Sequence, residues 1–228
     1  MLRALIFDMD GTITALTLPL EDMRRDTKAY FISKGLPPKL LEPADGISSS
    51  TAKAREYFLK EGMGLAEWNA MESDVDAILS QHEGMAARTA APLEGSLEIV
   101  KKIRQLGLKT AILTNNGRPA VNRILDQIPL REYFDIIQTR HESPKPKPFP
   151  DGLLRIIERL GLDRNEVIYV GDAMIDGVAA QRAAIEFWGV ATGETSASTL
   201  LDAGASRVFP SLKALLDFLE DEMRSQGS

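Results

Sequence analysis

The sequence contains no cysteine among its 228 residues. Disulfides and thiolate metal sites are therefore excluded, and the composition suits a reducing, cytoplasmic location, which we expect. No run approaches the ~20 apolar residues that a membrane span needs, so we expect no membrane partner. The N-terminus carries one basic residue and a short apolar run that Asp8 ends. This pattern indicates a buried strand rather than a signal peptide.

Basic residues are in deficit. The chain has 27 Lys and Arg against 33 Asp and Glu, with a net charge of −6, and its basic residues form no block. A nucleic acid needs a basic face on its partner, so we expect no nucleic-acid binding. An acidic protein can still bind a small phosphate compound if a divalent metal supplies local positive charge. The only two histidines, His82 and His141, lack the spacing of a metal pair, and the sequence does not indicate the oligomeric state.

Short apolar runs alternate with helical patterns along much of the chain. Continuous apolar runs suit strands that are buried on both faces, as in parallel sheets. The alternation predicts an α/β fold with a doubly wound, Rossmann-like parallel sheet. The expected strands are Leu2 to Phe7, Thr110 to Leu113, Phe134 to Ile137, Val167 to Val170 and Phe187 to Val190. The expected helices around them cover residues 97–106, 153–160 and 212–219.

One stretch interrupts this alternation. Residues 15–88 show helical periodicity and no convincing strand; the clearest amphipathic helix spans 65–79, and Pro19 suits the first turn of another. We therefore expect an all-α domain at 15–88, inserted after the first strand of an α/β core made of 1–14 and 89–228.

Two acid pairs follow expected strands. Asp8 and Asp10 come directly after the first strand, and Gly11 permits a sharp turn there. Asp172 and Asp176 follow a later strand. Both pairs follow strands, so their carboxylates can face the same carboxyl edge of the sheet, which is where open α/β sheets bind ligands. Hard oxygen ligands that converge in this way suit Mg²⁺. Taken singly, each pair could equally be an acidic turn or a helix cap.

Two further polar segments stand at strand or helix ends. Thr114 and Asn115 follow a strand and lead into a helix whose amides could face an anion. Residues 143–150 alternate proline with other residues and contain Lys145 and Lys147. A lysine on such a stiff loop could contact a phosphate. Each segment also has a plain explanation: Thr114 and Asn115 could belong to an ordinary turn, and residues 143–150 could be a connector with solvated lysines.

The order of these segments resembles the haloacid dehalogenase superfamily of phosphohydrolases. The matching stretches are Asp8-Met9-Asp10-Gly11-Thr12 for Asp-x-Asp-Gly-Thr, Thr114-Asn115 for the second motif, Lys147-Pro148-Phe149-Pro150 for Lys-Pro-x-Pro, and Gly171-Asp172 with Asp176 for Gly-Asp-x-x-x-Asp. The insert lies where the family has its type 1 helical cap, which resembles the phosphoglycolate phosphatase and β-phosphoglucomutase subgroup. Lys145 fits the third motif as well; we favour Lys147 because Pro150 and Asp151 then open the next helix at the family's offset. Ala15 and Leu16 replace an Asp-Ser pair that is common in this subgroup, which affects the expected cap hinge rather than the core chemistry.

The resemblance implies a Mg²⁺-dependent phosphatase that acts on a small phosphorylated metabolite such as phosphoglycolate or a sugar phosphate. Asp8 would be the nucleophile and Asp10 the general acid and base. The metal would lie between Asp8, the Asp10 carbonyl and Asp172, with Asp176 orienting these ligands. The transferring oxygens would be held by Thr114, the amide of Asn115 and Lys147.

Three alternatives share this pattern. A dehalogenase of the same fold would also use Asp8, but Asp10 marks phosphoryl chemistry in the family. A phosphomutase of the β-phosphoglucomutase type would keep every core residue and differ in its cap. A catalytically silent, phosphate-binding regulatory protein would usually have lost a motif residue, whereas this chain retains all of them.

Overall fold

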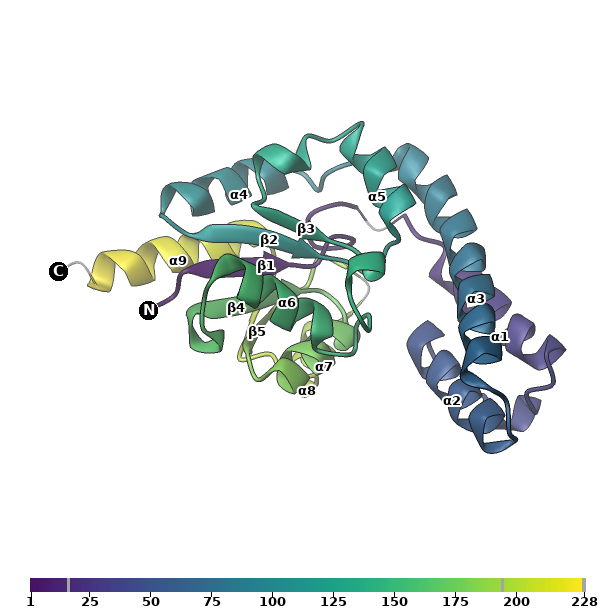
Figure 1. Cartoon of the computed structure of the whole chain (residues 1–228). Helices are drawn as coiled ribbons and strands as arrows, with labels where there is room; N and C mark the ends of the chain where they lie inside the picture. The colour runs from purple at the N-terminus through teal and green to yellow at the C-terminus, as the bar shows by residue number, and fades with distance from the viewer. Residues whose placement is uncertain (16, 194, 227–228) are drawn as a thin grey trace. The chain divides into compact units, whose positions relative to one another are not determined.

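The computed structural model describes residues 1–15, 17–193 and 195–226 (Figure 1). The chain divides into two compact units, one made of Met1–Thr17 with Thr89–Ser228 and the other of Leu18–Arg88. The sequence-based boundary of the insert lay at residue 15 and the second unit starts at residue 18. Among the described residues, no helix has the length and apolar character needed to cross a membrane.

The first unit is built on a six-stranded sheet whose order is β3-β2-β1-β4-β5-β6. All neighbouring strands are parallel. Their bounds are Ala4–Phe7 (β1), Lys109–Leu113 (β2), Ile136–Gln138 (β3), Val167–Gly171 (β4), Glu186–Val190 (β5) and Arg207–Phe209 (β6). The central strand β1 is buried throughout, which explains its uninterrupted apolar sequence. The predicted α/β fold with a doubly wound parallel sheet is confirmed.

Helices cover both faces of this sheet (Figure 1). Apolar side chains of α6, α7 and α8 form one buried cluster with β-strand residues such as Ile6 and Tyr169. On the other face, α4 packs on β2 and α9 packs on α4 and β6. The bounds are Ser96–Gln105 (α4), Arg118–Leu125 (α5), Asp151–Leu160 (α6), Met174–Ala183 (α7), Ala197–Asp202 (α8) and Leu212–Gln226 (α9).

The second unit consists of three α-helices around their own apolar cluster. They are Leu20–Ser33 (α1), Ile47–Lys60 (α2) and Leu65–Ala86 (α3). Trp68 is 1% exposed, and its ring stacks on that of Phe31 at a centroid distance of 6.1 Å. Trp68 is thus a core residue of this unit, as its place on an apolar helix face indicates.

Three elements were absent from the sequence interpretation. Helix α2 begins with Ile47-Ser48-Ser49-Ser50, and its buried face carries Ser50, Ala54 and Phe58, so its apolar pattern is weak. Strand β6 has only three residues, and α8 has only six. The third expected strand began two residues too early, because Phe134 is buried like a strand residue but precedes β3.

Candidate active site

The carboxyl ends of β1, β2 and β4 bring the predicted polar residues to one edge of the sheet. Asp8, Thr114 and Asp172 directly follow these strands, and each is less than 10% exposed. Strand β1 has β2 on one side and β4 on the other. The chain continues from β1 to β2 on one side of the sheet and from β4 to β5 on the other side, and such a switch point is where open α/β sheets bind ligands.

A buried cluster at this edge is centred on Lys147, which is 3% exposed. Its Nζ donates hydrogen bonds to Oδ1 of Asp8 at 2.6 Å and to Oδ1 of Asp176 at 2.7 Å. It also contacts the hydroxyl of Tyr169 at 3.0 Å, and that hydroxyl donates to Asp176 Oδ1 at 2.8 Å. Asp176 lies in the first turn of α7, where its Oδ2 accepts the Ala173 amide at 3.1 Å. Residues from a strand, a loop and a helix are thereby connected.

Asp172 is enclosed by two backbone segments. The Thr12 hydroxyl donates to its Oδ1 at 2.7 Å. A Cβ on Gly11 would lie 2.3 Å from Asp172 Oδ2, and a Cβ on Gly193 would lie 1.7 Å from that atom. The Thr192 hydroxyl donates to the Gly11 carbonyl at 2.6 Å and so joins the two segments. Only glycine fits at both positions without displacing the carboxylate.

The Asp10 carboxylate is oriented by different partners. Its Oδ2 accepts the Asn116 side-chain amide at 2.6 Å, and its Oδ1 accepts the Thr14 hydroxyl at 3.3 Å. The carboxylates of Asp8, Asp172 and Asp176 lie together instead, with candidate ligand atoms within 4.8 Å of one another. The predicted metal contact of Asp10 was its backbone carbonyl, so this orientation leaves its side chain available for proton transfer.

The second motif holds the lysine loop. The Asn115 side chain accepts from the Lys147 amide and donates to the Lys147 carbonyl, both at 3.0 Å. Thr114 is 2% exposed, and its hydroxyl accepts the Asn116 amide at 3.0 Å. Lys145 is exposed, and its Nζ lies 5.1 Å from the ring centroid of Phe149. Of the two lysines that fit the third motif, Lys147 is therefore the one beside Asp8.

Burial controls the protonation of these carboxyls. It raises the pKa of Asp8 well above the ordinary value; Lys147 opposes this rise, and Asp176 and Asp172 add to it. Burial, followed by the charge of Asp176, raises the pKa of Asp172 to about 7. Burial alone would lower the pKa of Lys147, but Asp176 and Asp8 outweigh it and raise that pKa, so the ammonium keeps its charge.

The charge of the cluster fits a divalent cation. Three carboxylates, those of Asp8, Asp172 and Asp176, share one buried edge with a single ammonium. Ionisation of all three would leave excess negative charge in a place of low dielectric, which is costly unless it is compensated. A divalent cation would supply the missing charge and favour the ionised carboxylates. The residues can hold a metal ion with oxygen ligands.

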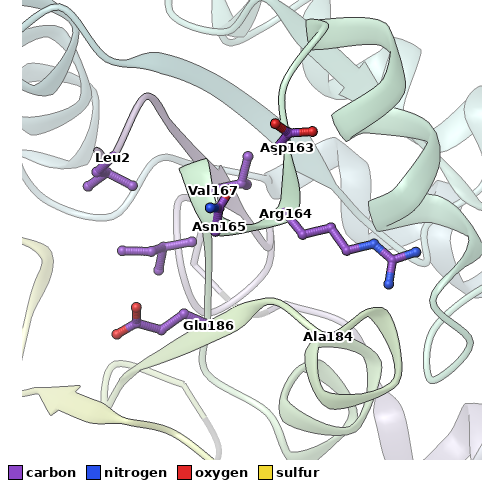
Figure 2. A pocket seen from close by; sticks show the side chains of 8 residues that line it. Leu2, Asp163, Arg164, Asn165, Val167, Ala184 and Glu186 are labelled. Atoms are coloured by element: carbon purple, nitrogen blue, oxygen red, sulfur yellow. The ribbon is translucent and has the colours of Figure 1, made fainter.

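A separate cavity lies at the opposite edge of the sheet. Its volume is about 760 Å³, and Figure 2 shows its lining near the amino ends of β4 and β5. The residues that line it include Leu2, Arg164, Val167 and Glu186. None of the four predicted motifs reaches this cavity, so we do not assign it to the reaction.

Three residues of the cluster were not singled out as site residues from the sequence. Thr12 bonds Asp172, Asn116 bonds Asp10, and Tyr169 bonds Lys147 and Asp176. Thr12 and Asn116 stand inside the recognised motifs, and their polar side chains were the available signal. Tyr169 lies within an apolar strand, where a tyrosine is most simply interpreted as a residue of the hydrophobic core.

Comparisons with known proteins identify the family and the fold that this chain shares. A family model described as haloacid dehalogenase-like hydrolase matches residues 2–184. A phosphoglycolate phosphatase of Agrobacterium fabrum is 26% identical over 227 residues, covering 98% of this chain and 94% of that protein. Phosphoglycolate phosphatase 1 of Pseudomonas aeruginosa is 25% identical, covering 94% and 78% of the two chains. The structure of a hydrolase from Pseudomonas syringae has a TM-score of 0.66 and 22% identity, covering 96% of this chain and 98% of that one, which supports the fold alone.

Proposed function

This chain belongs to the haloacid dehalogenase-like hydrolases, and we propose that it hydrolyses a small phosphate monoester through a phosphoryl-aspartate on Asp8. The enzyme is a phosphatase of this family. The observation that carries the proposal is the buried contact between Asp8 and Lys147 at 2.6 Å, beside the carboxylates of Asp172 and Asp176. A carboxylate held next to a fixed cation and a cation-binding cluster suits attack on an anionic phosphate.

The reaction has two displacements. One Asp8 carboxylate oxygen forms a bond to phosphorus while the phosphorus–oxygen bond to the leaving alcohol breaks. Asp10 gives its proton to that leaving oxygen. Water then attacks the phosphoryl-aspartate, Asp10 takes a proton from the water, and inorganic phosphate leaves with Asp8 restored. The amide of Asn116 at 2.6 Å and the Thr14 hydroxyl support the orientation that Asp10 needs in both steps.

Phosphate binding would use the residues around Lys147. Thr114, the Asn115 amide and the Lys147 ammonium would hold the oxygens of the transferring group, as the family resemblance implies. The side chain of Asn115 supports this role indirectly, since it bonds both the amide and the carbonyl of Lys147. The proposal thus assigns Asn115 two tasks, one by its backbone and one by its side chain.

Magnesium is the proposed cofactor. Asp8, Asp172 and the Asp10 carbonyl would hold it, with Asp176 orienting the set; the ion would neutralise charge between two anions, nucleophile and phosphate. The hard carboxylate oxygens favour Mg²⁺ over softer metals. The absence of cysteine also supports a cytoplasmic location. Many enzymes there use Mg²⁺ as a cofactor and phosphorylated metabolites as substrates.

The substrate class is a small phosphorylated metabolite, with phosphoglycolate and sugar phosphates as the first candidates. Two phosphoglycolate phosphatases among the relatives support this choice. We propose that the helical unit Leu18–Arg88 selects the leaving group, as the type 1 caps of the family do. A lid of this kind limits substrate size, so a folded phosphoprotein should be a poor substrate.

A substrate panel tests the proposal. The wild type and Asp8→Asn would be assayed for phosphate release from phosphoglycolate, several sugar phosphates, p-nitrophenyl phosphate and a phosphoprotein, with and without Mg²⁺. We expect Mg²⁺-dependent release from at least one small monoester by the wild type alone. The same core residues would also support a phosphomutase, and NMR would detect that activity as the conversion of one glucose phosphate isomer into another. Preference for the phosphoprotein over every small phosphate would refute the substrate class.

A further inference from the structure

Tyr169 is a fully buried ionisable residue with no part in the reaction described so far. It stands in the middle of β4, and its ring lies in the apolar cluster under α6 and α7. The ring centroid is 6.2 Å from that of Phe187. A phenylalanine would fill this space equally well. The hydroxyl is therefore the part of Tyr169 that packing does not explain.

The hydroxyl closes a triangle of hydrogen bonds. Lys147 can only donate, so the Tyr169 oxygen accepts from its Nζ at 3.0 Å. The Tyr169 proton then goes to Asp176 Oδ1 at 2.8 Å, an atom that also accepts from Lys147 at 2.7 Å. Burial, with the nearby charges of Asp176 and Asp8, raises the pKa of Tyr169, so this proton is retained.

The same contact limits the freedom of the lysine. An ammonium has three hydrogens, and Lys147 directs them to Asp8 at 2.6 Å, to Asp176 at 2.7 Å and to the Tyr169 oxygen. Two of these partners are carboxylates whose contacts would change when phosphate and metal bind. Tyr169 is a neutral partner, and its position is fixed by a strand in the centre of the sheet.

We propose that Tyr169 is a positioning residue. Its hydroxyl holds the Lys147 ammonium beside the Asp8 carboxylate, so that the lysine contacts the transferring phosphoryl group. The expected loss of kcat rests on the proposed function, whereas the expected effect on the Lys147 ammonium does not. Residues that orient the groups around a metal or reacting centre typically contribute about 10–100-fold to activity. Tyr169 does so here from the core side of the cluster.

The test compares Tyr169→Phe with a matched control. Thr110→Val removes a buried hydroxyl of the same sheet, which donates to the Tyr133 carbonyl at 2.6 Å near the amino end of β2, at the edge opposite to the site. We expect Tyr169→Phe to lower kcat about 10–100-fold with KM changed by less than about threefold, because positioning acts on the transition state. Thr110→Val should leave both constants within about twofold of the wild type.

Lysine-selective ¹H–¹⁵N NMR gives a readout that does not depend on activity. The Lys147 ammonium signal, assigned by its loss in Lys147→Arg, should be protected from hydrogen exchange in the wild type. In Tyr169→Phe its exchange should be faster, because one hydrogen has lost its buried partner. Unchanged exchange, or faster exchange with kcat within about twofold of the wild type, would overturn the proposal. If the wild type hydrolyses no monoester, the proposed function fails, while the exchange measurement still decides whether Tyr169 positions Lys147.

Discussion

Replacing Lys147 by methionine tests whether the cation in the cluster is as deeply embedded as the geometry indicates. Methionine keeps an unbranched chain of similar length and removes the charge. Lys147 is 3% exposed and is bonded to two buried carboxylates, those of Asp8 and Asp176. Removing one partner of a buried ion pair costs about 3–5 kcal/mol, since the other charge is left uncompensated.

The pH dependence of this loss has a defined sign. Burial raises the pKa of Asp8 above its ordinary value, and in Lys147→Met the lowering effect of the ammonium is gone, so that pKa rises further. Protonation of Asp8 relieves the uncompensated charge. The loss in free energy of unfolding should therefore be largest at pH 8 and shrink toward pH 5. Added Mg²⁺ should restore part of it at pH 8, because a cation replaces the missing charge.

Lys145→Met is the matched control, two residues away on the same loop. Lys145 is exposed, and its contact is with the ring of Phe149 at 5.1 Å. Such a contact is worth about 0.5–1 kcal/mol at an exposed site. Urea denaturation at pH 8 and pH 5, without metal, would measure both variants. A loss below about 1 kcal/mol for Lys147→Met, or equal losses for the two variants, would refute the reasoning.

Three further predictions concern other parts of the same unit. Asp10→Asn should lower kcat about 10²–10⁴-fold for poor leaving groups and less for p-nitrophenyl phosphate, and equal losses would argue against proton transfer by Asp10. Gly193→Ala places a Cβ 1.7 Å from Asp172 Oδ2, so calorimetry should show Mg²⁺ affinity reduced about 10–100-fold; wild-type affinity would contradict the enclosure of Asp172. Burial by itself would raise the pKa of Glu142, but hydrogen bonds from Arg118 outweigh that effect and lower the pKa to about 2. Its stabilisation is therefore present above about pH 4.5 and lost as pH falls toward 2, so the stability difference between wild type and Glu142→Gln should narrow over that range in thermal melts.

Motif spacing was sufficient to place the main polar residues of the site. Asp8 and Asp172 each follow a buried apolar strand, and the carboxyl ends of parallel strands meet at one edge. The proline-rich loop alone left its lysines open between a phosphate contact and solvent, and the family resemblance was what placed one of them at that edge. Between Lys145 and Lys147 the choice rested on family resemblance, because nothing in the local sequence says which side chain turns inward.

Other features depend on tertiary contacts that no local pattern encodes. Helix α2 has serine and alanine on its buried face, so its periodicity carries little hydrophobic signal. Strand β6 pairs with β5 over three residues, too few for a strand pattern. Gly193 and Asp172 are distant in sequence, and only the folded chain shows that a side chain at residue 193 would meet that carboxylate.

The nucleophile is the central claim, and trapping the phosphorylated enzyme tests it most directly. The wild type and Asp8→Asn would be mixed with a ³²P-labelled substrate from the panel and Mg²⁺, quenched in acid within milliseconds, and digested for mass spectrometry. We predict that the label is on the peptide containing Asp8, at a level that decays as phosphate is released, and that Asp8→Asn carries none. Label on another residue, or turnover by the wild type at full rate with no labelled protein at any time, would contradict the account.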